Sequence, residues 1–61
     1  MTPLWGIDLG GTKIEGVVAD ADKGYQPLAR LRIATEKEQG YAHIVSRIAL
    51  LVDMLKKETG L

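Results

Sequence analysis

The chain has 61 residues, 46% of them hydrophobic, with eight acidic side chains balancing eight basic ones, one histidine and no cysteine. A chain of this size buries only about 60% of the surface that its unfolded form exposes, and disulfides and thiolate metal sites are excluded as further sources of stability. The balanced charge argues against binding to nucleic acid or to an anionic membrane, and because no apolar run nears the roughly 20 residues of a bilayer span, we expect a cytoplasmic protein.

Residues 4–9 alternate in the manner of a β-strand. One face carries Trp5, Ile7 and Leu9, and the other carries Leu4, Gly6 and Asp8. Because both faces have apolar side chains, we expect a strand buried on both sides, with Asp8 at the carboxyl end of an interior strand.

The segment from Gly10 to Lys13 interrupts this alternation, and residues 14–19 resume a strand pattern rich in branched side chains. A strand, a tight glycine loop and a second strand predict a hairpin. Gly16 in the second strand has no side chain to pack. It marks either the close approach of another backbone or ligand, or a small residue beneath Trp5 or a helix, and both interpretations remain open.

A polar turn follows at residues 20–24. It has the acidic spacing of the start of a calcium loop. Tyr25 and Leu31, however, stand where such a loop needs glycine and glutamate, so we expect a plain turn.

A third strand is predicted for residues 27–33, opened by Pro27 where a missing N–H does least harm. Alternation places Ala29, Leu31 and Ile33 inward. Arg30 and Arg32 then point outward, and we interpret them as a solvated strand face.

Residues 35–40 form a charged connector before a helix. Thr35 and Glu38 have the spacing of a capping box, whereas Gly40 is the alternative helix start. Apolar side chains then recur at helical spacing up to about residue 58, and Gly60 predicts the end of the helix. The expected apolar stripe consists of Tyr41, Ile44, Val45, Ile48, Leu51, Val52 and Leu55. His43 lies beside the stripe and is expected to be a partly exposed helix residue rather than a ligand.

These elements predict an α/β unit in which a three-stranded antiparallel meander is followed by one helix lying across one face of the sheet. A first strand that is apolar on both sides calls for another strand beside it. We therefore expect residues 1–61 to be the incomplete N-terminal part of a larger domain, with no second domain and with one edge of the first strand unpaired or covered by another molecule. The alternative, a free-standing interaction module, would leave Leu4 and its face of the sheet exposed.

The chemistry of the chain is concentrated in the segment from Asp8 to Lys13. The amides of Gly10, Gly11 and Thr12 can converge on phosphate oxygens if glycine permits a positive φ. Asp8 is placed to hold Mg²⁺ through water, and Lys13 either neutralises charge near a terminal phosphate or faces solvent. The competing interpretation is an ordinary hairpin turn.

Two familiar phosphate motifs do not fit. A Rossmann fingerprint has spaced glycines that open a helix, but Gly10 and Gly11 are adjacent and a strand-like run follows them. A Walker A loop ends in Gly-Lys-Ser/Thr before a helix, whereas this chain has Gly11-Thr12-Lys13 before a strand.

The segment from Gly6 to Ile14, with the sequence Gly-Ile-Asp-Leu-Gly-Gly-Thr-Lys-Ile, resembles the first phosphate motif of the ROK family of bacterial repressors and sugar kinases, within the actin-like ATPase superfamily. The order Gly-Gly-Thr-Lys is similar to the glucokinase branch rather than to Hsp70-like proteins. The resemblance implies the start of a ribonuclease-H-like fold and covers the whole chain in layout.

The resemblance also implies an ATP-dependent hexose kinase of glucokinase or fructokinase type, acting on a sugar hydroxyl and dimeric in its full length. Asp8 would then organise Mg²⁺, and Gly10, Gly11, Thr12 and more weakly Lys13 would line the ATP phosphates. The catalytic aspartate and a structural zinc site are expected beyond Leu61, so none of the present residues is assigned as the catalytic base, and the chain alone would be inactive.

A sugar-responsive transcriptional repressor is the alternative function, since the ROK family contains both classes. Repressor members place a helix-turn-helix domain before this motif, and here the motif begins within ten residues of Met1. The kinase interpretation is therefore favoured.

Overall fold

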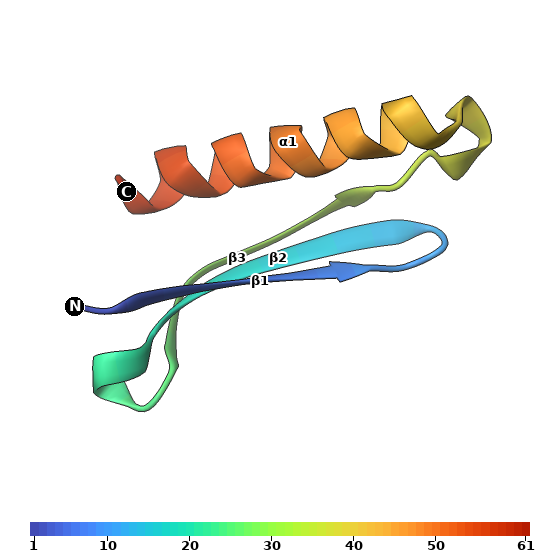
Figure 1. Ribbon diagram of the computed structural model, residues 1–61. Coiled ribbons are helices and arrows are strands. Elements are labelled where there is room, and N and C mark those ends of the chain that lie inside the picture. Colours follow the sequence, from blue (N-terminus) through green and yellow to red (C-terminus); the bar gives the residue numbers. More distant parts are fainter.

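The computed structural model describes all 61 residues. Three strands form one antiparallel sheet in the order β1-β2-β3: β1 (Pro3–Leu9), β2 (Lys13–Asp20) and β3 (Gln26–Ala34). The helix α1 (Tyr41–Thr59) follows them and lies across one face of the sheet (Figure 1). Two short 3-10 helices occupy the connections, η1 (Ala21–Lys23) and η2 (Lys37–Gln39). The predicted meander followed by a helix is confirmed.

The core lies between β2 and the second half of α1. Ile14 and Val18 face the helix from the sheet, and Leu51 and Leu55 face the sheet from the helix; all four are fully buried. Gly16 lies between them: a Cβ added there would be 2.7 Å from Leu55 Cδ1 and 3.1 Å from Leu51 Cδ2. Of the two interpretations of Gly16, close packing of the helix is therefore the one that the structure supports.

The cross-strand register decides which residues of β3 join this core. Ile33 lies opposite Ile14, and Leu31 lies opposite Gly16, so both point toward the helix and pack against the core. Arg30 and Arg32 alternate with them and are exposed on the opposite face of the sheet, as predicted.

The strand β1 lies at an edge of the sheet and pairs only with β2. The prediction of an interior strand is therefore wrong for this chain, because the middle strand of a consecutive meander is the second one. The prediction of an unpaired edge is confirmed. Since α1 packs on β2 and β3, apolar side chains of β1 stay exposed on both faces, with Leu4 at 52% and Leu9 at 54%.

The turn between β2 and β3 is held by the buried carboxylate of Asp20. Its Oδ1 atom accepts hydrogen bonds from the amides of Asp22 at 3.0 Å and Thr2 at 3.2 Å. Two successive residues with positive φ, Gly24 and Tyr25, then reverse the chain. The predicted polar turn is confirmed.

The helix begins after Gly40, so the capping-box interpretation of Thr35 and Glu38 is wrong. Gly60 ends it in a left-handed conformation, as predicted, and donates its amide to the carbonyl of Lys56 at 2.8 Å.

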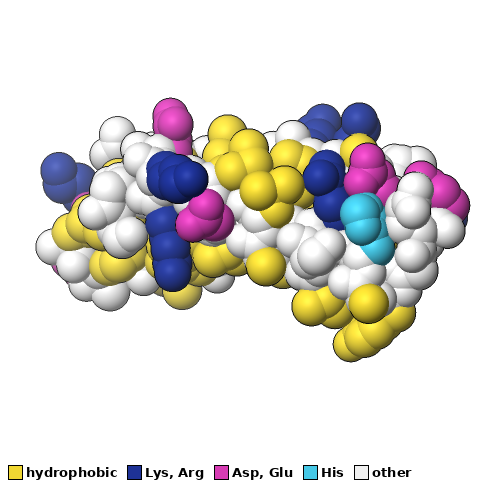
Figure 2. Space-filling view, turned by 90° about the horizontal axis from the view of Figure 1, so that it is seen from above, with side chains coloured by type: hydrophobic (Ala, Val, Ile, Leu, Met, Phe, Trp, Pro, Cys, Tyr) yellow, Lys and Arg dark blue, Asp and Glu magenta, His cyan; other side chains and the backbone are white.

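The expected apolar stripe is only partly buried. The stripe is exposed at the start of the helix, where Tyr41 is 82% and Val45 is 47% exposed. The helix contacts η2 as well as the sheet, so its first part is not packed on the sheet alone. Hydrophobic side chains accordingly remain visible on the helix side of the molecule (Figure 2). No helix of the protein combines the length and the apolar character that crossing a membrane requires.

Candidate phosphate-binding loop

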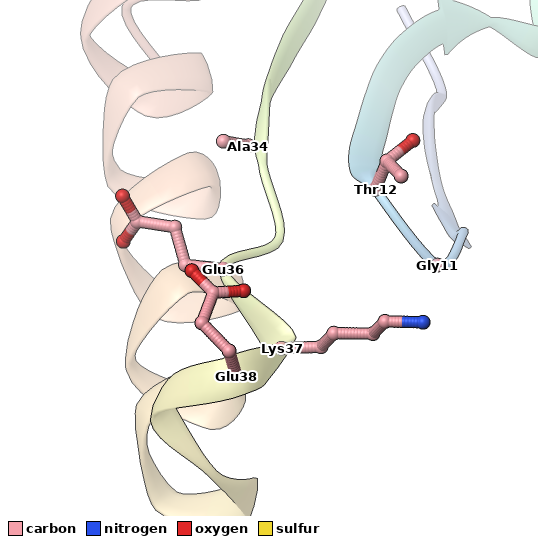
Figure 3. Close-up of a pocket in the computed structure, with 6 residues that line it drawn as sticks. All are labelled: Gly11, Thr12, Ala34, Glu36, Lys37 and Glu38. Atoms are coloured by element: carbon pink, nitrogen blue, oxygen red, sulfur yellow. The ribbon is translucent and has the colours of Figure 1, made fainter.

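A cavity of about 240 Å³ lies between the β1–β2 loop and the connector that leads from β3 to α1 (Figure 3). The loop contributes Gly11 and Thr12, and β3 with the connector contributes Ala34, Glu36, Lys37 and Glu38. The predicted phosphate loop is therefore one wall of a cavity, and the charged connector is the other wall.

Thr35 joins these two walls. Its backbone amide donates to the carbonyl of Thr12 at 2.9 Å, and its hydroxyl donates to the carbonyl of Gly10 at 3.0 Å. The residue is 1% exposed. Both bonds hold the loop against the end of β3, so that the loop and the connector form one unit.

The loop backbone differs from the predicted arrangement at Gly10. The Gly10 amide donates to the carbonyl of Lys13 at 2.9 Å, and neither Gly10 nor Gly11 has a positive φ. The premise that three amides converge through a left-handed glycine is therefore wrong. The amides of Gly11 and Thr12 make no hydrogen bond within the chain and remain available as donors.

The two adjacent glycines have different structural requirements. A Cβ on Gly10 would lie 2.9 Å from the carbonyl oxygen of Lys13, so the turn itself needs a glycine there. A Cβ on Gly11 would meet only Lys37 Nζ, at an ordinary distance of 3.7 Å. The fold thus leaves the missing side chain of Gly11 unexplained, and a ligand that approaches the backbone closely would explain it.

Asp8 and Lys13 do not line the cavity. Asp8 lies opposite Glu15 in the strand register, and the alternation of β2 puts Lys13 and Glu15 on the same face of the sheet, away from the helix. The carboxylate of Asp8 is in no ion pair or hydrogen bond of the chain, which keeps it available to a cation.

The donor set around Asp8 can be compared with what Mg²⁺ requires. The protein has no group of three or more acidic, histidine or cysteine side chains that could hold a metal. Mg²⁺ bound to nucleotide phosphates keeps several waters and needs only one or two carboxylates, so a single free Asp8 near the loop fits that mode.

Glu15 is held by two arginines on the exposed sheet face. Its Oε2 atom accepts from Arg32 Nη2 at 2.7 Å, and its Oε1 atom lies 3.5 Å from Arg30 Nε. The hydrogen bond from Arg32 is the main reason that the pKa of the Glu15 carboxyl is lowered. Glu15 therefore stays ionised, and its negative charge is paired with the positive charges of Arg32 and Arg30.

Glu36 has a left-handed backbone, with φ of 57° and ψ of 46°. Such a conformation costs a residue with a side chain about 1–2 kcal/mol. Its Oε1 atom lies 2.7 Å from His43 Nε2 and 3.4 Å from Arg47 Nε, while Arg47 also donates to the carbonyl of Ala34 at 3.0 Å. The hydrogen bond with His43, followed by the charge of Arg47, lowers the pKa of the Glu36 carboxyl. His43 is thus a partly exposed helix residue, as predicted, with a structural role.

The resemblance to the ROK motif implies a catalytic aspartate beyond Leu61, and this stays a prediction. Leu61 itself follows the end of α1 and is 43% exposed, and its amide donates to the hydroxyl oxygen of Thr59 at 3.4 Å. It does not line the cavity, and neither does any other residue of the last turn of the helix. The cavity is thus built from the loop, the end of β3 and the connector, and its two acids, Glu36 and Glu38, come from the connector.

Sequence reasoning missed Thr35 and Lys37 as parts of this site. Neither residue has a spacing that relates it to the loop, and the polar run around them is typical of a solvated connector. The polarity of Thr35 combined with its position at the end of a strand was the one available signal.

Comparison of this chain with family models, with curated proteins and with solved structures finds no match.

Proposed function

We propose that residues 1–61 are the ATP-phosphate-binding N-terminal segment of an ATP-dependent hexose kinase of glucokinase or fructokinase type. The enzyme works in the cytoplasm and phosphorylates a sugar hydroxyl. This chain holds the nucleotide phosphates, and the carboxylate that deprotonates the sugar lies beyond Leu61. The resemblance of Gly6 to Ile14 to the first ROK phosphate motif supports the reaction class.

The observation that carries phosphate binding is the pair of unused amides at Gly11 and Thr12, on the wall of a cavity of about 240 Å³. Adjacent backbone N–H groups and a hydroxyl are the donors that phosphate oxygens accept. A glycine that the fold does not need allows a phosphate to reach these donors without meeting a side chain. The Thr35 bonds hold the loop in place before any ligand arrives, which lowers the entropy that binding must remove.

Asp8 immediately precedes the loop and does not line the cavity, and from that position it would hold Mg²⁺ through the water shell of the ion. Mg²⁺ held in this way would supply positive charge that offsets the charge of the phosphates during phosphoryl transfer. The part of this chain in catalysis is to position the donor phosphates and to keep their charge balanced.

Titration of the ¹⁵N-labelled chain with ATP and Mg²⁺ tests phosphate binding. We expect saturable shifts of the Gly11 and Thr12 amide signals, and smaller shifts with AMP, which lacks the outer phosphates. Gly11→Val places a side chain beside the cavity and should abolish these shifts. The matched control is Gly6→Ala on β1, where the nearest atom to the new Cβ is Val17 Cγ1 at 3.4 Å.

The absence of saturable shifts at Gly11 and Thr12 would contradict the proposal. Assays of ATP-dependent hexose phosphorylation are expected to show no turnover by the purified chain. Turnover would show that the catalytic carboxylate lies within these residues after all, before Leu61.

A further inference from the structure

We propose that Lys37 is a phosphate-contacting side chain that completes the site from the connector, and that Glu36 is a positioning residue that directs Lys37 toward Gly11. This inference rests on the proposed phosphate-binding function and adds to it a residue outside the Gly-Gly-Thr-Lys motif. Lys37, rather than the motif residue Lys13, supplies the cation at the cavity.

The side chain of Lys37 extends from η2 across the cavity toward the loop (Figure 3). Its Nζ atom lies 3.7 Å from the position that a Cβ of Gly11 would take. Lys37 is exposed and belongs to no ion pair of the chain. An exposed ammonium group that lies beside Gly11 and has no carboxylate partner is available to an anion.

Lys13 lacks this placement. It opens β2 on the face of the sheet away from the helix and does not line the cavity. The two lysines therefore have the same charge but different positions relative to the free amides.

The direction of Lys37 follows from the backbone immediately before it. Glu36 is left-handed, and its carboxylate is held on the helix side by His43 and Arg47. The amides of Gln39 and Gly40 donate to the carbonyls of Glu36 at 3.0 Å and Lys37 at 3.1 Å, which closes the turn of η2. With Glu36 held toward α1, the next side chain leaves the connector on the opposite side, toward the loop.

The charges around Lys37 also suit this role. Glu36 is paired with His43 and Arg47, so its charge is largely compensated. Glu38 is the remaining acid that lines the cavity, and it is in no ion pair. Lys37 therefore offsets Glu38, while the amides of Gly11 and Thr12 supply further donors.

Binding of inorganic tripolyphosphate to the full chain, followed by NMR or calorimetry, tests the inference. Removing one exposed charge-assisted contact in Lys37→Gln should weaken binding about fivefold to tenfold. Lys37→Arg should restore most of the affinity. Lys23→Gln in η1, at the far end of the sheet, is the matched control, and Lys13→Gln is expected to change the affinity far less than Lys37→Gln.

The positioning role of Glu36 is tested in the wild-type chain and in the Lys37→Gln variant. Glu36→Ala should weaken tripolyphosphate binding in the wild-type chain and have no additional effect when combined with Lys37→Gln. Additive effects of the two substitutions would overturn this role.

Two results overturn the inference in distinguishable ways. If the wild-type chain binds tripolyphosphate and Lys37→Gln binds it equally well, Lys37 has no such role and the proposed function stands. If the wild-type chain binds neither tripolyphosphate nor ATP, both proposals fail.

Discussion

The hydroxyl of Thr35 donates a 3.0 Å hydrogen bond to the carbonyl oxygen of Gly10, which joins the end of β3 to the loop before β2. Thr35 is almost fully buried, whereas Gly10 is exposed, so the bond lies partly out of the solvent. Together with the amide bond from Thr35 to Thr12, it ties the candidate phosphate loop to a strand with which the loop has no sequence proximity.

Thr35→Val should therefore destabilise the chain, because the nearly isosteric side chain leaves the Gly10 carbonyl without its donor. We expect a loss of about 1–2 kcal/mol in the free energy of unfolding, measured by urea denaturation. Thr59→Val is the control. The Thr59 hydroxyl donates to the carbonyl of Leu55 at the partly exposed end of α1, so its loss should lower the free energy of unfolding less. Equal stability of Thr35→Val and the wild type would contradict a structural role for the bond.

The adjacent glycines of the loop should separate stability from binding. Gly10→Ala brings a Cβ to 2.9 Å from a backbone oxygen and is expected to lower the unfolding midpoint. Gly11→Ala has room and should stay within about 0.5 kcal/mol of the wild type while weakening tripolyphosphate binding. The two variants are compared by urea denaturation and by titration with tripolyphosphate. Reversal of this pattern would refute the assignment of Gly11 to the ligand.

Gly16→Ala tests the packing of the helix on the sheet. The new Cβ would lie 2.7 Å from Leu55 Cδ1, and overpacking of this kind costs about 1–3 kcal/mol. Thermal unfolding should show a lower midpoint, whereas Gly6→Ala on the edge strand should unfold close to the wild type. A Gly16→Ala midpoint equal to that of Gly6→Ala would mean that α1 moves away at little cost.

Acid should destabilise the connector through Glu36. Its pKa is lowered below the ordinary value of 4.5, mainly by the hydrogen bond with His43 and then by Arg47, so the folded state binds a proton less readily than the unfolded state. The stability it contributes is present above that ordinary value and is lost as pH falls through the lower folded pKa.

Glu36→Gln should accordingly show a shallower loss of stability than the wild type when urea midpoints are compared between neutral pH and about pH 3. Glu15, whose pKa is lowered by Arg32, has the same sign and accounts for part of the remaining slope. An unchanged slope in Glu36→Gln would show that the His43 and Arg47 contacts do not persist in solution.

Glu38 lines the cavity as an unpaired acid and should oppose anion binding. Glu38→Gln is expected to raise the affinity for tripolyphosphate about twofold to threefold at low salt, with the gain shrinking as salt screens the charge. Glu58→Gln, near the far end of α1, is the matched control for the loss of one acid. Weaker binding by Glu38→Gln would indicate that this carboxylate accepts a hydrogen bond from the ligand or holds its cation.

The elements of the fold could be predicted because each is marked by neighbours close in sequence. A period of two was enough to predict that Leu31 and Ile33 lie on one face of β3 and Arg30 and Arg32 on the other. Apolar residues three and four positions apart were enough to predict the span of α1. The loop itself stood out because the strand patterns stopped on both sides of it. These features do not depend on how the strands and the helix are arranged in space, so they can be predicted without knowing the tertiary structure.

The parts that could not be predicted all depend on how distant segments meet. Whether the Gly10 amide is free depends on turn geometry, and whether Tyr41 is buried depends on where the connector meets the helix. The hydrogen bond from Thr35 to Gly10 joins residues that are 25 positions apart in the chain, and Lys37 lies beside Gly11 across the same boundary. Glu36, between Thr35 and Lys37, has a left-handed backbone, and its carboxylate contacts His43 and Arg47 of α1. Local periodicity thus decides the strands and the helix of this protein. The way the connector packs against the loop decides which donors face the cavity, and no sequence periodicity indicates that packing.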